Sequence, residues 1–138
     1  MINIAILLKL MNIFTHNCHN IVAHVSFFSD HEKLAEFYDK YDEDYDDVIE
    51  RYIGINGVES IDLIEINNAA NNALSNYPID YKSNRDCFRI LLELEQKLCM
   101  FIEEEISTVK HSEGTKQLLG EICNQSEKRQ YLIKRRLG

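Results

Sequence analysis

Residues 19–51 read HNIVAHVSFFSDHEKLAEFYDKYDEDYDDVIER, and this stretch decides how the rest of the chain is interpreted. His19 and His31 stand twelve residues apart, on either side of a predicted helix break. Asp46 and Glu50 follow at an i,i+4 spacing, which on a helix places both side chains on one face, one turn apart. Neutral imidazole and carboxylate together suit iron, zinc or manganese. The stretch therefore predicts a metal site.

The composition indicates one helical domain. The chain has 138 residues, 45% of them hydrophobic and 28% charged, which is ordinary for a soluble globular protein and predicts a single domain over 1–138. Five glycines and one proline indicate an all-α fold with few turns. The net charge of -8 disfavours a nucleic-acid binder held by counterion release, and it favours a surface that attracts cations.

The cysteines and the N-terminus indicate a cytoplasmic protein. The four cysteines form no C-x-x-C pair and each falls inside a predicted helix, so we expect reduced thiols and no disulfide framework: Cys18, Cys87, Cys99 and Cys123. The apolar residues 1–14 are too few to span a bilayer, which needs about 20, and they lack a basic leader and a cleavage site. They predict a buried first helix and no membrane partner.

Apolar periodicity and turn residues predict four long helices and a short one. Ser29 and Glu32 form a capping box that starts the second helix. Gly54 and Gly57 are expected to stop it after about Ile53, and Ser83 caps the third long helix. In chain order, including the short helix in the long connection, the predicted ranges are 2–28, 29–53, 67–74, 83–109 and 114–136.

Carboxylates are absent from the chain before Asp30, and this limits where a metal site can be built. The di-iron site inside a four-helix bundle takes carboxylates from its helices together with Glu-x-x-His motifs. The first predicted helix cannot supply an acid, and no Glu-x-x-His occurs in the second or the fourth. A metal site enclosed within one chain is therefore disfavoured.

From about His16 to the C-terminus the sequence resembles the Dps-type mini-ferritins, the ferritin-like proteins that protect DNA in starved cells. The motif of that family is a His, an aromatic-containing turn, a second His twelve residues later, and then Asp, three residues, Glu and Arg. Residues 76–80, Asn-Tyr-Pro-Ile-Asp, resemble the segment before the family's third long helix. The residues that match the motif are His19, Phe27-Phe28, His31, Asp46 and Glu50-Arg51.

The resemblance implies a ferritin-like four-helix bundle with a short extra helix between its second and third helices. It also implies a metal site between two subunits at a twofold axis, with His19 and His31 of one subunit facing Asp46 and Glu50 of the other, twice per interface. Ferrous iron would be oxidised there by peroxide or dioxygen, as a defence against oxidative stress. The ferric product would be stored in a cage that is usually dodecameric. Zn²⁺ and Mn²⁺ are the other metals that the ligand set allows.

One position departs from the family pattern. Ala35 stands where the family usually has an acid, four residues after the second His. Glu36 is adjacent but points about 100° away on a helix, and Asp39 and Asp42 are the other candidate substitutes. The alternative function is therefore a non-catalytic cage or interaction protein with a reduced metal site, and a plain helical adaptor with a solvated acidic face is a third.

The lysine-rich, flexible N-terminal tail with which some family members bind DNA is absent. With the acidic total charge, this predicts no tight direct DNA binding.

Three further polar residues fall on apolar stripes. Glu95 lies in the stripe of the third long helix, and a buried carboxylate is unfavourable unless it is paired. A salt bridge or a hydrogen bond from a tyrosine hydroxyl is favoured over a role as an extra metal ligand. A lone His on an apolar helix is more often a hydrogen-bonded boundary residue than a ligand, which is the interpretation for His16 and His24.

Overall fold

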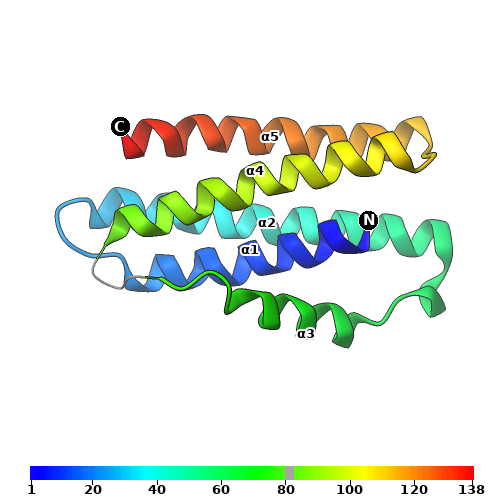
Figure 1. The fold of residues 1–138 in the computed structure, drawn as a ribbon, viewed down its shortest axis with the longest axis horizontal. Helices are drawn as coiled ribbons and strands as arrows, with labels where there is room; N and C mark the ends of the chain where they lie inside the picture. Colours follow the sequence, from blue (N-terminus) through cyan, green and yellow to red (C-terminus); the bar gives the residue numbers. More distant parts are fainter. Residues whose placement is uncertain (80–82) are drawn as a thin grey trace.

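The computed structural model of the chain describes residues 1–79 and 83–138, and Figure 1 shows a bundle of long helices. Helix α1 packs along α2, α4 packs along α5, and α1 also contacts α4. These contacts join two antiparallel helix pairs into one bundle, as the all-α prediction requires. The elements are α1 (Ile2–Ile21), α2 (Phe27–Asn56), the 3-10 turn η1 (Val58–Ser60), α3 (Leu63–Leu74), α4 (Asn84–Thr108) and α5 (Glu113–Leu137).

The connection between the two helix pairs carries α3. Helices α2 and α4 run in the same direction, so the chain between them returns along the length of the bundle, and α3 lies against α1 on the way (Figure 1). The short helix was predicted to start at Asn67, but it starts at Leu63. Asp62 caps it by accepting hydrogen bonds from the backbone N–H groups of Ile64 and Glu65, at 3.0 and 3.2 Å.

The predicted boundary between the first two helices is wrong. Helix α1 ends at Ile21 and not near Phe28, and the chain reverses over residues 22–26, where His24 has a φ of 69°. The side chain of Asn84 holds this turn, because its amide donates to the backbone carbonyl of Ala23 at 2.8 Å and accepts from the Ala23 N–H at 3.2 Å. A contact from a residue far along the chain therefore sets the end of α1.

The predicted start and end of the second helix are also wrong. Ser26, and not Ser29, is the N-cap of α2, and its hydroxyl donates to the Asp30 carboxylate at 2.7 Å. Gly54 lies inside α2, and only Gly57, with a φ of 89°, ends it. Glycine is tolerated within a helix at a moderate cost, and it is the residue that most readily adopts a positive φ.

The interior is one apolar cluster built from the long helices. Helix α1 is buried along much of its length, as predicted from its apolar sequence. Ser83 caps α4 as predicted, and all four cysteines are free. The bulkiest of the fully buried side chains are Tyr41, Phe14, Ile4, Leu8, Met11, Leu34, Leu91, Leu94, Leu98, Ile102, Leu119 and Ile133.

Candidate metal centre

The turn after α1 brings the two histidines of the motif into contact. His19 lies near the end of α1 and His31 near the start of α2, and both are half-buried. Their imidazole rings stack with centroids 3.6 Å apart and planes 21° apart. His19 Nδ1 lies 2.7 Å from the carbonyl oxygen of His31, and His31 Nδ1 lies 2.9 Å from the carbonyl oxygen of His19. Each ring is thus held by the backbone of the other residue.

This reciprocal pairing fixes the tautomer of both rings. A carbonyl oxygen can only accept a hydrogen bond, so each Nδ1 must carry the proton and donate it. The Nε2 atom of each neutral ring is then left with its lone pair, which is the form in which imidazole binds a metal. Ligating histidines in metalloproteins are oriented in this way by a hydrogen bond at the other ring nitrogen. The pair therefore presents two oriented nitrogen donors.

A buried ion pair anchors the turn that carries the histidines. The Asp30 carboxylate is 2% exposed and accepts from Arg136 Nε and Nη2, each at 2.9 Å, and from Asn84 Nδ2 at 3.1 Å. Burial alone would raise the pKa of Asp30, but hydrogen bonds from Arg136, Ser26 and Asn84 hold it below its usual value. The start of α2 is thereby joined to the start of α4 and to the end of α5.

A third histidine lies beside the pair. His16 is exposed on α1, its ring centroid is 6.0 Å from that of His19, and it stacks on Tyr38 at 4.3 Å. The sequence analysis interpreted His16 as a boundary residue and did not use the spacing that indicates this proximity. The i,i+3 spacing of His16 and His19 puts both on one side of α1. The site thus has a third imidazole within reach of solvent.

The two acids of the motif do not meet the histidines within one chain. Asp46 and Glu50 are both exposed on α2, one turn apart. They lie further along the same helix than His31, by roughly 22 Å for Asp46 and roughly 28 Å for Glu50 at 1.5 Å per residue. Glu50 lines a surface hollow together with Asp47 and Arg51. Within a single chain these four residues are therefore divided into a histidine pair and an acid pair that lie apart.

The substitutes proposed for the missing acid are placed differently from each other. Ala35 is half-buried, and Glu36 is exposed and accepts from Lys33 Nζ at 2.7 Å. Asp42 is exposed on the same face of α2 as His31, three turns further along. Glu36 is thus paired with Lys33, and Asp42 lies roughly 16 Å along α2 from His31.

The acidic run between residues 42 and 47 is not a uniformly solvated face. Asp44 is 2% exposed, its Oδ1 is 3.1 Å from Lys40 Nζ, and its Oδ2 has no hydrogen-bond partner. Burial raises the pKa of Asp44, and the attraction of Lys40 offsets only part of that shift. Asp42, Asp46 and Asp47 are exposed. The exposed part of the run is what remains available to a cation.

Glu95 belongs to a core network, as favoured from the sequence. It is fully buried and accepts from the Tyr41 hydroxyl, from Ser126 Oγ at 2.5 Å and from Arg129 Nε at 2.5 Å. Burial and the adjacent Glu95 charge raise the pKa of Tyr41 well above its usual value, so the phenol stays a donor. Both predicted kinds of partner, a cation and a tyrosine hydroxyl, are present.

Sequence reasoning missed one cluster of ligand side chains. Cys99 of α4 lies beside Cys123 and Glu127 of α5, and ligand atoms of all three fall within 4.8 Å of one another. Burial, the Cys99 thiol and nearby acids raise the pKa of Cys123 to about 12. The two cysteines are 24 residues apart on different helices, so no local pattern in the sequence could have paired them.

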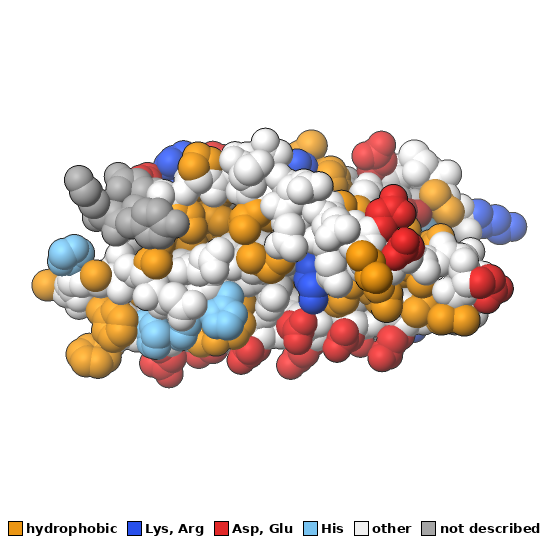
Figure 2. Space-filling view, turned by 90° about the horizontal axis from the view of Figure 1, so that it is seen from below, with side chains coloured by type: hydrophobic (Ala, Val, Ile, Leu, Met, Phe, Trp, Pro, Cys, Tyr) orange, Lys and Arg blue, Asp and Glu red, His pale blue; other side chains and the backbone are white. Residues whose placement is uncertain are grey.

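The histidines and the acidic side chains occupy neighbouring parts of the surface. In Figure 2 the histidines gather near one end of the molecule, and acidic side chains follow along the same edge. In the part of the chain that the structure describes, no helix is both long and apolar enough to cross a membrane.

Two helix pairs joined by a crossover that carries a short helix define a ferritin-like bundle, and the stacked histidines lie at one end of it. The chain belongs to the ferritin-like family, since the Ferritin-like domain matches residues 4–138. In an alignment 134 residues long, which covers 93% of this chain and 88% of the other protein, it is 30% identical to General stress protein 20U of Bacillus subtilis (strain 168). No solved structure matches the chain significantly. Ferritin-like proteins commonly bind metal and form oligomers.

Proposed function

We propose that the chain is a Dps-like iron-binding cage protein. It oxidises ferrous iron at sites shared between twofold-related copies, with peroxide or dioxygen as the oxidant, and stores the ferric product. His19 and His31 of one copy and Asp46 and Glu50 of the other are the iron ligands. The observation that supports the proposal is the reciprocal hydrogen bonding of the two histidines, which leaves the Nε2 lone pair of each ring available to a metal.

The spacing along α2 supports a shared site. If two copies pack antiparallel through this helix, the twofold axis passes midway between His31 and the acid pair, close to Asp39 and Lys40. Each histidine pair then lies opposite the acids of the other copy, and the isologous contact makes two equal sites. The net charge of -8 draws ferrous iron to the surface. Two nitrogen and two carboxylate donors suit Fe²⁺, while Zn²⁺ and Mn²⁺ are competing cations.

Ala35 favours a second candidate function, a non-catalytic cage with a reduced metal site. Its methyl group supplies no ligand on the face of α2 near His31, so a second iron at each site would be held weakly. Ferrous oxidation needs electrons to leave iron for the oxidant, and peroxide takes one electron from each of two ferrous ions as it becomes water. A site with one firmly held iron would turn over slowly, although it would still bind metal.

Aerobic ferrous oxidation, followed by the absorbance of the ferric product, separates the two functions. We expect the wild type to oxidise iron at least tenfold faster than His19→Ala or Glu50→Ala, because each variant loses a donor from every site. His24→Asn and Glu93→Ala are matched controls that change an exposed histidine and an exposed acid outside the proposed ligand set, and they should keep the wild-type rate. Equal rates for the wild type and the two site variants would leave only the non-catalytic cage.

Co-assembly tests whether the site is shared. When His19→Ala and Glu50→Ala chains are dissociated, mixed in equal amounts and reassembled, half of the twofold pairs are mixed, and each mixed pair has one intact site. Activity should therefore return to about a quarter of the wild-type value. Either variant reassembled alone should stay inactive. A mixture as inactive as its components would mean that each site is built by one chain.

The assembly we propose is a homododecamer of twofold dimers that does not bind DNA tightly. Native mass measurement with and without iron reports the number of subunits and the metal content together. A gel shift at low salt tests the second point, since a surface with a net charge of -8 should not hold a polyanion. A retarded complex that persists near physiological salt would contradict it.

A further inference from the structure

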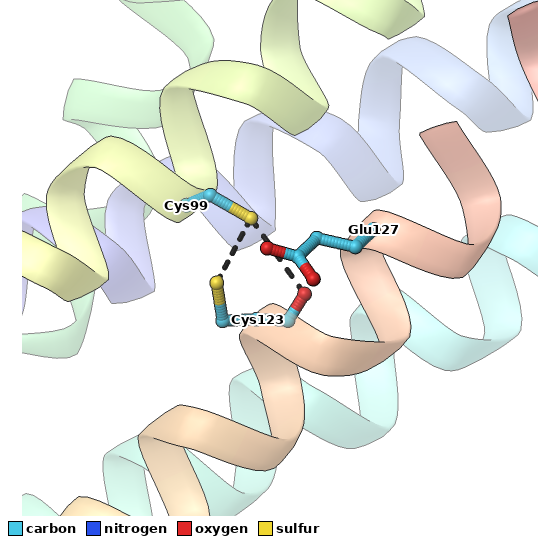
Figure 3. Close-up of side chains that lie close together, drawn as sticks. All are labelled: Cys99, Cys123 and Glu127. Carbon is cyan, nitrogen blue, oxygen red and sulfur yellow. Dashed lines mark hydrogen bonds between the residues drawn. The ribbon is translucent and has the colours of Figure 1, made fainter. Parts of the chain in front are cut away.

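The space between α4 and α5 contains donors unlike those of the iron site. Figure 3 shows Cys99 from α4 turned toward Cys123 and Glu127 from α5, with all three side chains directed into one gap between the helices. The two Sγ atoms are 3.0 Å apart, and a carboxylate oxygen of Glu127 completes the group within 4.8 Å. Two sulfurs and one carboxylate oxygen thus converge on a single point.

The spacing of these residues explains the convergence. Cys123 and Glu127 are four residues apart on α5, so they lie on one face, one turn apart. Cys99 faces them from the neighbouring helix, and its thiol also donates to the backbone carbonyl of Cys123 at 3.6 Å. Rigid helices therefore fix the positions from which the three side chains reach inward.

The geometry fits a tetrahedral cation with sulfur ligands. Zn–S bonds of about 2.3 Å and Zn–O bonds of about 2.0 Å at tetrahedral angles place ligand atoms roughly 3.5–3.8 Å apart. The thiols at 3.0 Å need to separate by less than about 1 Å, which a small rotation of either side chain provides. The three ligands leave a fourth position, and Glu127 is exposed, so water and the incoming metal have access.

A supporting residue is also in place. Gln130 Nε2 lies 3.5 Å from Cys99 Sγ and 3.4 Å from the backbone carbonyl of Glu95, so one N–H can donate to the sulfur while the other holds the amide in position. Hydrogen bonds from outside the ligand set orient metal-binding sulfur and stabilise the thiolate. Gln130 is therefore placed to hold the Cys99 sulfur in a fixed orientation when a metal binds.

We propose that Cys99, Cys123 and Glu127 form a second metal site that takes a thiophilic divalent cation of the zinc class and joins α4 to α5. Two thiolates favour Zn²⁺ over Mn²⁺ or Fe²⁺, because softer ligands and the order of divalent affinities both act in that direction. Binding displaces one proton from each thiol and involves no electron transfer. The site shares no residue with the proposed iron centre, so either can fail without the other.

Cobalt(II) is the probe, because it takes the same tetrahedral site and its bonds to thiolate absorb in the near ultraviolet. Reduced, metal-free full-length protein titrated with Co²⁺ should develop this band at one equivalent per chain. Zn²⁺ should abolish it at one further equivalent, whereas a tenfold excess of Fe²⁺ should leave most of it.

Variants assign the band to its residues. Cys123→Ser should remove it and weaken binding by more than about 100-fold, and Glu127→Gln should weaken binding roughly 10-fold to 100-fold while keeping the band. His19→Ala must leave it unchanged, and so must Cys87→Ser, which tests a cysteine outside the cluster. The proposal is overturned if reduced wild type gives no thiolate band, if the band survives in Cys123→Ser, or if Cys99 and Cys123 are found already joined as a disulfide under reductant.

Discussion

Replacing Glu95 by Gln tests the central contact of the fold. The carboxylate is fully buried and receives hydrogen bonds from Tyr41, Ser126 and Arg129, so it joins α2, α4 and α5 in the middle of the bundle. Glutamine has nearly the same shape and can still accept from the two hydroxyl groups. What it removes is the negative charge opposite a guanidinium that is only 6% exposed.

The expected loss follows from that unpaired charge. Leaving one partner of a buried ion pair without its counter-charge typically lowers the free energy of unfolding by about 3–5 kcal/mol. Because glutamine keeps part of the hydrogen bonding, we expect about 3 kcal/mol, the lower end of that range. The total free energy of unfolding of a typical domain is about 5–15 kcal/mol, so the variant should still fold but should unfold at a much lower urea concentration.

Urea unfolding followed by circular dichroism measures this loss, at one fixed chain concentration because association also stabilises the fold. The double variant Glu95→Leu/Arg129→Met is the control, since removing both charges should destabilise less than removing one. The reasoning is refuted if Glu95→Gln lies within about 1 kcal/mol of the wild type. If the variant stays folded but loses ferrous oxidation, Glu95 is a metal ligand after all.

Two further predictions concern the helix ends. Gly57→Ala should lower the free energy of unfolding in urea by about 1–3 kcal/mol, because φ is 89° and an alanine is strained in that backbone conformation. Gly54→Ala should raise it by about 0.5–1 kcal/mol, because Gly54 is helical and a Cβ there would meet nothing within 4 Å among the described residues. Two changes of the same sign would contradict this. The pKa of Asp30 is lower in the folded chain than its ordinary value of 3.8. The contribution of Asp30 to the stability of the folded state is therefore complete above pH 3.8 and is lost as the pH falls through the lower folded pKa. In Asp30→Asn the thermal unfolding midpoint should therefore change less with pH in the acid range than it does in the wild type. If the midpoint changed with pH as steeply as in the wild type, Asp30 would be excluded as the source of the pH dependence.

The helices could be predicted from the sequence because each has a long apolar stripe. The start of α4 was predicted from its cap at Ser83, and the extent of α5 was predicted closely from its apolar residues. Asp80, in the segment that resembles the family before the third long helix, lies outside the described residues. Where the chain has a local signal and a long periodic run, sequence reasoning was sufficient.

The boundary between α1 and α2 could not be predicted in the same way. Residues 22–28 contain neither glycine nor proline, so periodicity carried the first helix through them. The structure ends α1 at Ile21 because Asn84, more than sixty residues away, bonds both backbone groups of Ala23. Ser29 offered a good capping pattern, but Ser26 became the cap by joining the buried Asp30. At this turn, contacts between distant residues set the helix ends, and local sequence signals do not.

The candidate iron site was predictable in composition and not in geometry. The spacing of the motif in the sequence paired His19 with His31 and placed Asp46 and Glu50 on one face of a helix. It contained no information on the stacking of the rings or on the carbonyl partners that orient them. Those features follow from the reversal at residues 22–26, which was predicted in the wrong place.

The reciprocal bonding of the two histidines makes a specific prediction about their coupling. Each imidazole is oriented by a backbone carbonyl of the other residue, and a backbone carbonyl survives substitution of its side chain. His19→Ala should therefore leave His31 with its Nδ1 hydrogen bond and its Nε2 available, and His31→Ala should do the same for His19. Each single variant loses one ligand and the ring stack, without misorienting the remaining donor.

A double-mutant cycle on ferrous or cobalt affinity measures this independence. If the remaining ring keeps its orientation, each substitution should weaken binding roughly 10-fold to 100-fold, and the double variant should approach the product of the two factors. The same cycle on urea midpoints isolates the contribution of the stack, about 0.5–1.5 kcal/mol for stacked rings. If either single variant already abolished binding, the rings would be orienting each other through their side chains. Such a result would remove the physical basis for treating the pair as two separately oriented donors.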